Sequence, residues 1–405
     1  MQVLYERCCG LDVHKKTVTV CLITPEVREV RTFGTFTEDL REMKDWLLSH
    51  GCTHVAMEST GVYWKPIWNL LEETGMDLLL VNARDLKAVP GRKTDVKDSE
   101  WIADLMRHGL LRGSFVPDRA QRELRELVRY RRSLIDERSR EANRIQKLLE
   151  GANIKLASVA SDVLGKSGKA MLQAIANGET DPKVLASLAL RKLKNKRPQL
   201  EKALEGLIGS HQRHLLAVQL RHVFFLDDEI DRLSAQIKER MRPFVAEIEL
   251  LETIPGVARQ TAEDVLAEIG TDMEQFPTGG HLASWAGVCP GSNESGGKRK
   301  SGRTRTGNKH LRAALVRSAH SAARTRNTYL SVQYKRLAAR RGSKRAAVAV
   351  AHTMLVCMHA MLKYRIPYED PGHDFYDQLR KDRVITSAVR RIESLGYKVT
   401  VEEVA

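Results

Sequence analysis

The spacing of apolar residues divides this 405-residue chain into differently folded parts. Short β-branched or alternating runs in the first hundred residues predict five strands, at 8–14, 17–23, 30–36, 53–58 and 76–81. The segments 38–49 and 64–74, which lie between them, carry apolar residues at helical spacing. The order of three strands, a helix, a strand, a helix and a strand predicts an α/β domain with a mixed sheet, and Lys15-Lys16 joins the first two strands as a hairpin.

Long helices are predicted beyond residue 115. A charged helical pattern covers 118–150 and ends at Gly151, and a second covers 215–241 before Pro243 stops it. The second carries apolar residues at spacings of four and three, namely Leu226, Ile230, Leu233, Ile237 and Met241. The two helices together predict an antiparallel coiled-coil arm. The stretch 152–210, rich in Ala and Lys, predicts short helices to which no chemistry is assigned.

A chain of this length is too long for one ordinary core, so several domains are expected. We place an α/β domain at 1–115, the helical arm at 116–245, a compact and mostly helical C-terminal domain at 246–365 and a weakly defined tail at 366–405.

The formal charge of +15 is concentrated in one segment. Residues 1–115 hold 15 Lys and Arg against 17 Asp and Glu, whereas residues 281–350 hold 16 Lys and Arg against Glu294 alone. A solvated face normally mixes both signs, so the segment indicates a polyanionic partner. Nucleic acid is favoured over a membrane, because the segment lacks the bulky apolar stripe of a membrane-surface helix.

Cysteine usage and hydropathy indicate a cytoplasmic protein without a membrane partner. The six cysteines form no CxxC pair and no zinc-ligand pattern with histidine, so neither a disulfide framework nor a zinc site is expected. No run of residues approaches 18 consecutive apolar side chains, and the first ten residues do not resemble a secretory leader.

Four acidic residues in the first hundred suggest a metal site. Asp12 lies in the first predicted strand, Glu58 ends the fourth, and Asp95 and Asp98 open a helix after the turn at Pro90-Gly91. Hard oxygen donors that converge at a sheet edge suit one or two Mg²⁺ ions and hence phosphodiester chemistry. Taken singly, each acid also has a structural explanation, such as an N-cap at Asp95 or a solvent-facing strand end at Glu58.

A glycine-rich basic loop is predicted near the C-terminus. Within 284–315 the glycines and Pro290 argue against a regular element, and Asn308 is expected to cap the helix that begins KHLRAAL. Seven bases and no acid follow Gly297, and we predict that they contact phosphates: Lys298, Arg299, Lys300, Arg303, Arg305, Lys309 and Arg312. The alternative is a flexible basic linker.

Residues 251–269 resemble a helix-hairpin-helix, whose turn would present backbone amides to DNA phosphate. Ala258 stands where that motif usually has its second glycine, so a simple helix-packing turn is an equal alternative.

Three motifs carry a family resemblance, in this order: GLDVHKKT at 10–17, AMESTGVYW at 56–64 and GRKTDVKDSEWIADL at 91–105. They resemble the motifs of the IS110-family transposases, whose N-terminal domain is similar to the junction resolvase RuvC and has a ribonuclease H-like fold. The resemblance implies that Asp12, Glu58, Asp95 and Asp98 are the DEDD ligands of Mg²⁺ or Mn²⁺. Asp104 lacks the matching context.

The basic loop also resembles this family, because Pro290 to Gly296 meets its Pro-x-x-x-x-Ser-Gly pattern. The resemblance implies that Ser295 is the nucleophile, although Ser292 and Ser301 share the loop. It further implies an insertion-sequence transposase or recombinase, guided by a structured non-coding RNA and assembled as a dimer or tetramer on DNA at the bacterial nucleoid. Two alternatives stay open: a metal-dependent junction-resolving nuclease that uses water, and a non-catalytic DNA-binding protein.

Overall fold

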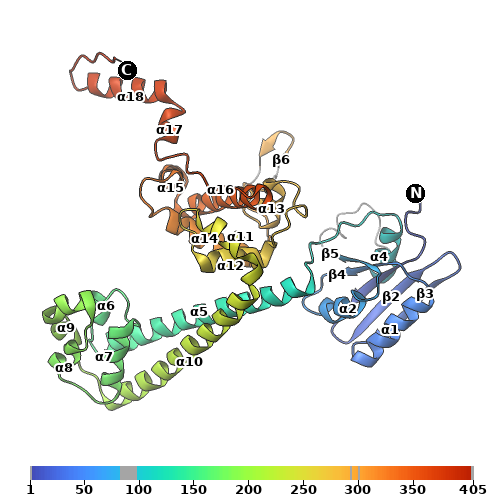
Figure 1. Ribbon diagram of the computed structural model, residues 1–405, viewed down its shortest axis with the longest axis horizontal. Helices are drawn as coiled ribbons and strands as arrows, with labels where there is room; N and C mark the ends of the chain where they lie inside the picture. The colour runs from blue at the N-terminus through green and yellow to red at the C-terminus, as the bar shows by residue number, and fades with distance from the viewer. Residues whose placement is uncertain (1, 83–97, 292–293, 300–301, 403–405) are drawn as a thin grey trace. The chain divides into compact units, whose positions relative to one another are not determined.

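The computed structural model describes residues 2–82, 98–291, 294–299 and 302–402 (Figure 1). The chain forms two compact units, Met1–Arg122 and Glu123–Ala405, and each is described by itself.

The N-terminal unit is built on a five-stranded mixed sheet, as predicted. The sheet order is β3-β2-β1-β4-β5, with β1–β2 and β2–β3 antiparallel and β1–β4 and β4–β5 parallel. Its strands are β1 (Cys8–Val13), β2 (Thr17–Ile23), β3 (Arg28–Gly34), β4 (His54–Glu58) and β5 (Asp77–Val81). The hairpin between β1 and β2 is closed by the His14 N–H, which donates to the Thr17 carbonyl at 2.9 Å. This layout is compatible with the expected ribonuclease H-like α/β fold.

Helices cover the two faces of this sheet. One face packs on α1 (Thr37–Ser49) and α2 (Trp64–Leu71), through a core that includes Leu11, Val20, Met43, Leu47, Met57 and Ile67. The other face packs on α4 (Asp98–Arg107), through Cys8, Ala56, Val81, Ile102 and Met106. Successive residues of a strand point to opposite faces, so Leu11 and its neighbours at two-residue spacing fill the first core while Cys8 joins the second.

The helix α4 lies directly on β1 because Gly10 has no side chain. A Cβ atom built on Gly10 would lie 2.3 Å from the Ala103 nitrogen and 2.4 Å from the Ser99 carbonyl oxygen. Any other residue at position 10 would therefore force the helix away from the sheet.

Two long helices, α5 (Arg119–Gly151) and α10 (Ser210–Arg240), run antiparallel (Figure 1). Both lie in the C-terminal unit except for the first four residues of α5. Arg240 pairs with Glu123 at 3.0 Å near one end, and His222 lies 3.5 Å from Glu141 further along. Both long helices were thus correctly predicted from the sequence. That they wind around each other as a coiled coil stays a prediction.

The chain between these helices folds into a small cluster at their end, which we call the arm tip (residues 152–209). It consists of α6 (Leu156–Val159), α7 (Lys166–Ala176), α8 (Pro182–Ser187), the 3₁₀ helix η1 (Arg191–Lys196) and α9 (Arg197–Leu204). Apolar side chains from the tip, among them Leu156, Met171 and Leu200, pack in one core with side chains of the long helices. The latter include Ile145, Leu149 and Leu220.

The rest of the described chain is mostly helical, as predicted for 246–365, and helices also occur in 366–405, where a weakly defined tail was predicted. Its elements are η2 (Arg242–Phe244), α11 (Val245–Glu252), α12 (Arg259–Ile269), α13 (Gly279–Trp285), β6 (Glu294–Ser295), β7 (Lys298–Arg299), α14 (Lys309–Ala322), α15 (Tyr329–Arg341), α16 (Ser343–Tyr364), α17 (Phe375–Gln378) and α18 (Lys381–Glu393). Within the described residues, α16 is the one helix long and apolar enough to cross a membrane. Its residues Val350, Met354 and Met358 are fully buried, so its apolar character serves the core.

Charged side chains are buried where α5 meets α12 and α14. Arg131 of α5 is only 3% exposed and donates to Glu263 at 2.8 Å and Asp264 at 3.3 Å. Arg317 of α14 donates to the second oxygen of Asp264 at 3.2 Å. Burial raises the pKa of Asp264, against the lowering effect of Arg131 and Arg317. Arg129 of α5 holds both oxygens of Glu268, at 2.7 and 2.8 Å.

We predict that Gly10→Ala displaces α4 and destabilises the N-terminal unit by about 1–3 kcal/mol, because the new methyl group overlaps the backbone of that helix. Hydrogen–deuterium exchange of peptides covering 98–107 should accelerate. Gly151→Ala is the matched control, because a Cβ there meets nothing within 4 Å. Unchanged exchange in Gly10→Ala would show that α4 does not depend on this contact.

A second prediction concerns Arg131→Met, which keeps the side-chain volume but leaves Glu263 and Asp264 without their buried cation. Native-state hydrogen exchange of α12 amides should report a loss of about 3–5 kcal/mol. Adding Glu263→Gln and Asp264→Asn to this variant should restore part of the loss. The control Arg232→Met removes an exposed arginine paired with Glu229, where about 0–1 kcal/mol is expected. Equal losses in the two arginine variants would contradict the proposed role of the buried network.

Candidate functional site

Two of the predicted metal ligands lie side by side on neighbouring parallel strands. Leu11 of β1 is in register with Met57 of β4, so the next residues along the strands are Asp12 and Glu58. Two residues earlier, Gly10 and Ala56 face α4, and the period of two puts Asp12 and Glu58 on that same face. Since carboxyl ends of parallel strands share an edge, both acids lie at one edge of the sheet.

Asp98 is brought to this edge by the direction of α4. The Arg107 carbonyl at the end of α4 accepts hydrogen bonds from the Leu4 and Tyr5 amides, just before β1 begins. The helix therefore runs antiparallel to β1, and its first residue, Asp98, lies toward the end of β1 that carries Asp12. Asp95, the fourth predicted ligand, lies outside the described residues.

The chemistry of this set fits a hard divalent cation, because all three described members are carboxylates. Among the residues that the structure describes, no three His, Cys, Asp or Glu side chains gather closely enough to hold a metal ion by themselves. The three described members of the predicted set thus lie at one face and edge of the sheet, while the metal site itself stays a prediction.

His14 lies beside this site, although it is not one of the predicted ligands. Its Nε2 atom lies 3.2 Å from an Asp12 carboxylate oxygen. The signal was available, because His14 is two positions after Asp12 and alternate positions of an extended chain share a face. By contrast, Asp104 pairs with Arg28 of β3, at 3.0 and 3.1 Å, which agrees with leaving it out of the metal set.

The predicted serine loop contains a short hairpin, which corrects the expectation that its glycines prevent any regular element. β6 pairs antiparallel with β7, with Ser295 opposite Lys298. Gly296 and Gly297 have φ angles of 58° and 72°, the left-handed values that a tight two-residue hairpin turn requires. The backbone of Ser295 thus immediately precedes this turn. Ser292, Lys300 and Ser301 lie outside the described residues.

The neck of this loop is closed by backbone contacts. The Gly291 N–H donates to the Arg303 carbonyl at 2.9 Å, and the Asn308 N–H donates to the Trp285 carbonyl at 3.1 Å. Gly287 and Gly307 pack so closely that a Cβ on Gly307 would lie 2.3 Å from the Gly287 nitrogen. The hairpin therefore projects from a fixed base.

Asn308 caps α14, as predicted, and also ties the loop to the buried charge network. Its side-chain oxygen accepts from the His310 and Leu311 amides at 3.0 and 3.1 Å, while its Nδ2 donates to Glu268 at 2.6 Å. Burial acts to raise the pKa of Glu268, but hydrogen bonds from Arg129 and Asn308 outweigh it and hold that pKa below its usual value. Glu268 is therefore a charged anchor for the end of the loop.

The predicted phosphate-contacting bases are largely on the surface. Lys298, Arg303, Arg305 and Lys309 are exposed, and Arg312 is half-buried. The side chain of Arg299 and the whole of Lys300 are not described.

The predicted helix-hairpin-helix forms a turn between α11 and α12 that is packed inside the protein. Gly256 has a φ of 89°, and a Cβ there would lie 2.4 Å from the Ala322 nitrogen and 2.7 Å from the Ser318 carbonyl oxygen of α14. This close packing favours the helix-packing alternative over phosphate binding at this glycine.

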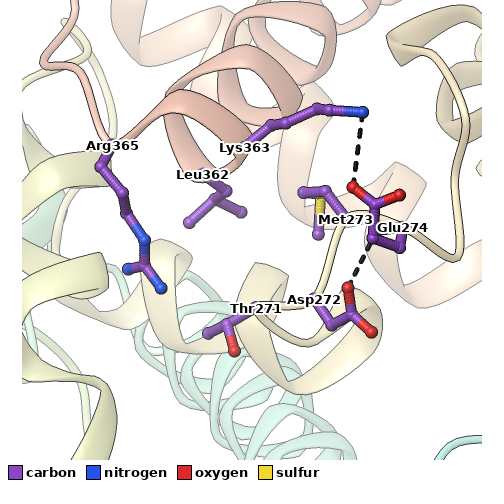
Figure 2. A pocket seen from close by; sticks show the side chains of 7 residues that line it. All are labelled: Thr271, Asp272, Met273, Glu274, Leu362, Lys363 and Arg365. Atoms are coloured by element: carbon purple, nitrogen blue, oxygen red, sulfur yellow. Dashed lines mark hydrogen bonds and ion pairs between the residues drawn. The ribbon is translucent and has the colours of Figure 1, made fainter.

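A pocket of about 360 Å³ opens between the end of α12 and the end of α16 (Figure 2). It is lined by Thr271, Asp272, Met273, Glu274, Leu362, Lys363 and Arg365. Glu274 pairs with Lys363 at 3.6 Å, and the Glu274 N–H donates to Asp272 at 2.9 Å. No predicted site residue lines this pocket, so it gives no support to a separate small-molecule function.

Comparison with known proteins adds two family matches. Residues 9–154 match the family model of DEDD transposases of the IS110 type, described as a transposase. Residues 248–335 match the family described as Transposase IS116/IS110/IS902.

Curated relatives agree with these matches. A 43.6 kDa protein of the insertion element IS110 from Streptomyces coelicolor is 26% identical over 69% of this chain and 73% of its own length. A pilin gene-inverting protein of Moraxella lacunata is 22% identical over 90% of this chain and 98% of its own. A 42 kDa protein of the insertion element IS900 from Mycobacterium paratuberculosis is 28% identical over 74% and 80%. The two family matches together cover more than half of the chain, which therefore belongs to the IS110 family of transposases and acts as a DNA transposase or recombinase.

Proposed function

We propose that this transposase breaks and rejoins DNA strands with a divalent cation held by Asp12, Glu58, Asp95 and Asp98 and a nucleophilic serine, Ser295. The observation that carries the metal site is the meeting of β1, β4 and the start of α4, which puts Asp12, Glu58 and Asp98 on one face and edge of the sheet. Mg²⁺ or Mn²⁺ fits these oxygen donors and, when bound, would stabilise the charge that develops on the phosphodiester during displacement.

The protein scaffold contributes orientation to this site. Asp12 and Glu58 lie on hydrogen-bonded strands, and the close contact at Gly10 fixes the helix that carries Asp98. Groups borne by such elements move little, so the ligands are preorganised before a cation or DNA arrives. The His14 ring also lies beside this site, with its Nε2 atom 3.2 Å from an Asp12 carboxylate oxygen.

Ser295 performs the displacement in this proposal. Its hydroxyl oxygen attacks phosphorus, one phosphorus–oxygen bond of the DNA backbone breaks, the serine proton leaves and the departing DNA oxygen ends as a hydroxyl. The phosphoserine bond conserves the bond energy, so a DNA hydroxyl can later attack the same phosphorus and release the serine. The tight glycine turn after Ser295 leaves room for a DNA backbone to approach.

Rejoining favours a recombinase over a nuclease that hydrolyses with water. The relative from Moraxella lacunata is named as a pilin gene-inverting protein, and inversion of a segment requires that broken strands be joined again. A recombinase and a hydrolysing nuclease would both use the acidic site, so the serine nucleophile is the feature that distinguishes them.

The finer assignments rest on the family resemblance. We propose that 1–115 is the RuvC-like catalytic domain, 116–245 a coiled-coil arm, and 246–365 the domain that carries the serine and the phosphate-contacting bases, followed by the tail 366–405. A structured non-coding RNA would guide the enzyme, which would assemble as a dimer or tetramer on DNA in the bacterial cytoplasm, at the nucleoid.

We predict that Asp12→Asn, Glu58→Gln, Asp95→Asn and Asp98→Asn each abolish metal-dependent strand breakage, because each removes a charged oxygen donor. DNA binding and thermal stability should stay near those of the unmodified protein. Asp104→Asn is the matched control, since this acid lies on the same helix but pairs with Arg28. Near-normal cleavage by two or more of the four variants would disprove the metal assignment.

We further predict that Ser295→Ala abolishes recombination while the acidic site remains complete. On a nicked suicide substrate, the unmodified protein should yield DNA that migrates with protein after denaturation, and peptide mapping should place the link on Ser295. Ser292→Ala and Ser301→Ala are the controls and should retain the adduct. Recombination by Ser295→Ala without any adduct would eliminate the serine mechanism and leave water as the nucleophile.

A further inference from the structure

The arm tip carries a basic surface to which the family matches assign no role. Between Pro182 and Leu200 the chain has six bases and no acid, and all six are exposed. We call them the tip patch: Lys183, Arg191, Lys192, Lys194, Lys196 and Arg197. Four of them lie on the single 3₁₀ helix η1 and Arg197 follows it directly, so their charges are close together in space as well as in sequence.

Protein carboxylates do not neutralise this patch. In the described parts of the chain, no salt bridge joins any of the six bases to an acid, and their side-chain hydrogen bonds go to carbonyls, from Lys196 to Val159 at 3.3 Å and from Arg197 to Ser187 at 3.2 Å. Two nearby acids accept hydrogen bonds from backbone amides close to them in the sequence. Asp162 accepts from the Leu164 amide and Asp181 from the Lys183 amide, which caps α8.

The patch is held by a folded core and is not part of a loose lysine-rich tail. Leu185, Ala186, Ala189 and Leu200 are at most 1% exposed and pack in the core of the arm tip. The Leu190 N–H just before η1 donates to the Ser167 hydroxyl at 2.9 Å. The backbone that carries these charges is therefore ordered before a partner binds, so less conformational entropy is lost on binding.

The shape of the patch fits a linear polyanion. A 3₁₀ helix rises about 2 Å per residue, so the bases of η1 extend over roughly 10 Å. Duplex DNA carries one charge per about 1.7 Å of axis, or roughly six phosphate charges over that distance. An anionic membrane is disfavoured. Val184 and Leu190 are the large apolar side chains exposed between Pro182 and Leu200, at 45% and 49%, and two such side chains are fewer than the apolar stripe of a membrane-surface helix requires.

We propose that the tip patch binds the sugar–phosphate backbone of duplex DNA, as a contact distinct from the segment 298–312. The inference requires only that the chain acts on DNA, so it stands whether or not Ser295 is the nucleophile. Phosphate contacts of this kind position a protein on DNA without reading its sequence.

The test compares two charge-matched triple variants of the full-length protein. In the tip variant, Lys192→Gln, Lys194→Gln and Lys196→Gln remove three positive charges from the patch. In the control, Arg232→Gln, Arg240→Gln and Arg242→Gln remove the same charge from the α10–η2 region, where each arginine already pairs with a glutamate, at 2.8, 3.0 and 3.1 Å. Fluorescence anisotropy on a mixed-sequence duplex gives the slope of log affinity against log salt for each variant.

The tip variant should flatten this slope by roughly 2–3 units if all three lysines contact phosphate, whereas the control should leave it close to that of the unmodified protein. A double variant, Lys192→Gln with Lys194→Gln, keeps the Lys196 contact with Val159 and should flatten the slope by roughly 1–2 units even if the triple variant folds poorly. Equal flattening by the tip and control triples would overturn the proposal. So would a change confined to a structured RNA hairpin probe with no effect on duplex DNA.

Discussion

The packing of the C-terminal unit depends on arginines that neutralise the buried carboxylates of α12. Glu263, Asp264 and Glu268 are all buried on this helix, and a buried charge without a partner costs several kcal/mol. Arg129 and Arg131 of α5 and Arg317 of α14 supply the partners, so three helices from separate stretches of the chain must assemble together. The link from Glu268 to Asn308 extends this requirement to the neck of the serine loop. The loop is therefore exposed at its hairpin but anchored at its base.

A different constraint organises the N-terminal unit, where a missing side chain decides the geometry. Gly10 allows the backbone of α4 to touch β1, which no larger residue permits. That contact fixes the height and direction of α4 over the sheet and hence the place of Asp98 relative to Asp12. Gly10 thus shapes the candidate site, although it contributes no functional group to it.

The sequence predicted most of the fold, because its elements have clear periodicity. The five strands, the two long helices and the Asn308 cap were found within a few residues. The hairpin at Gly296-Gly297 was not predicted, because adjacent glycines often interrupt regular elements, although the same pair suits a left-handed two-residue turn. The buried charge network could not be predicted from the sequence either. Nothing in the residues around Glu263 and Asp264 distinguishes them from acids that face solvent, and their arginine partners are far away along the chain. For the site, the placement of Asp12 and Glu58 followed from strand ends and that of Asp98 from the start of a helix, while the roles of all the predicted site residues stay predictions.

The distribution of charge follows from the chemistry of such a site. Carboxylates that hold a cation repel DNA phosphates until the cation is bound, so the α/β domain, with a slight excess of acids in 1–115, is poorly suited to attract DNA on its own. The attraction has to come from elsewhere in the chain, and the excess of bases in 281–350 and at the arm tip can supply it. If Asp12, Glu58, Asp95 and Asp98 hold the metal as proposed, most of the net attraction for DNA must therefore come from bases outside 1–115.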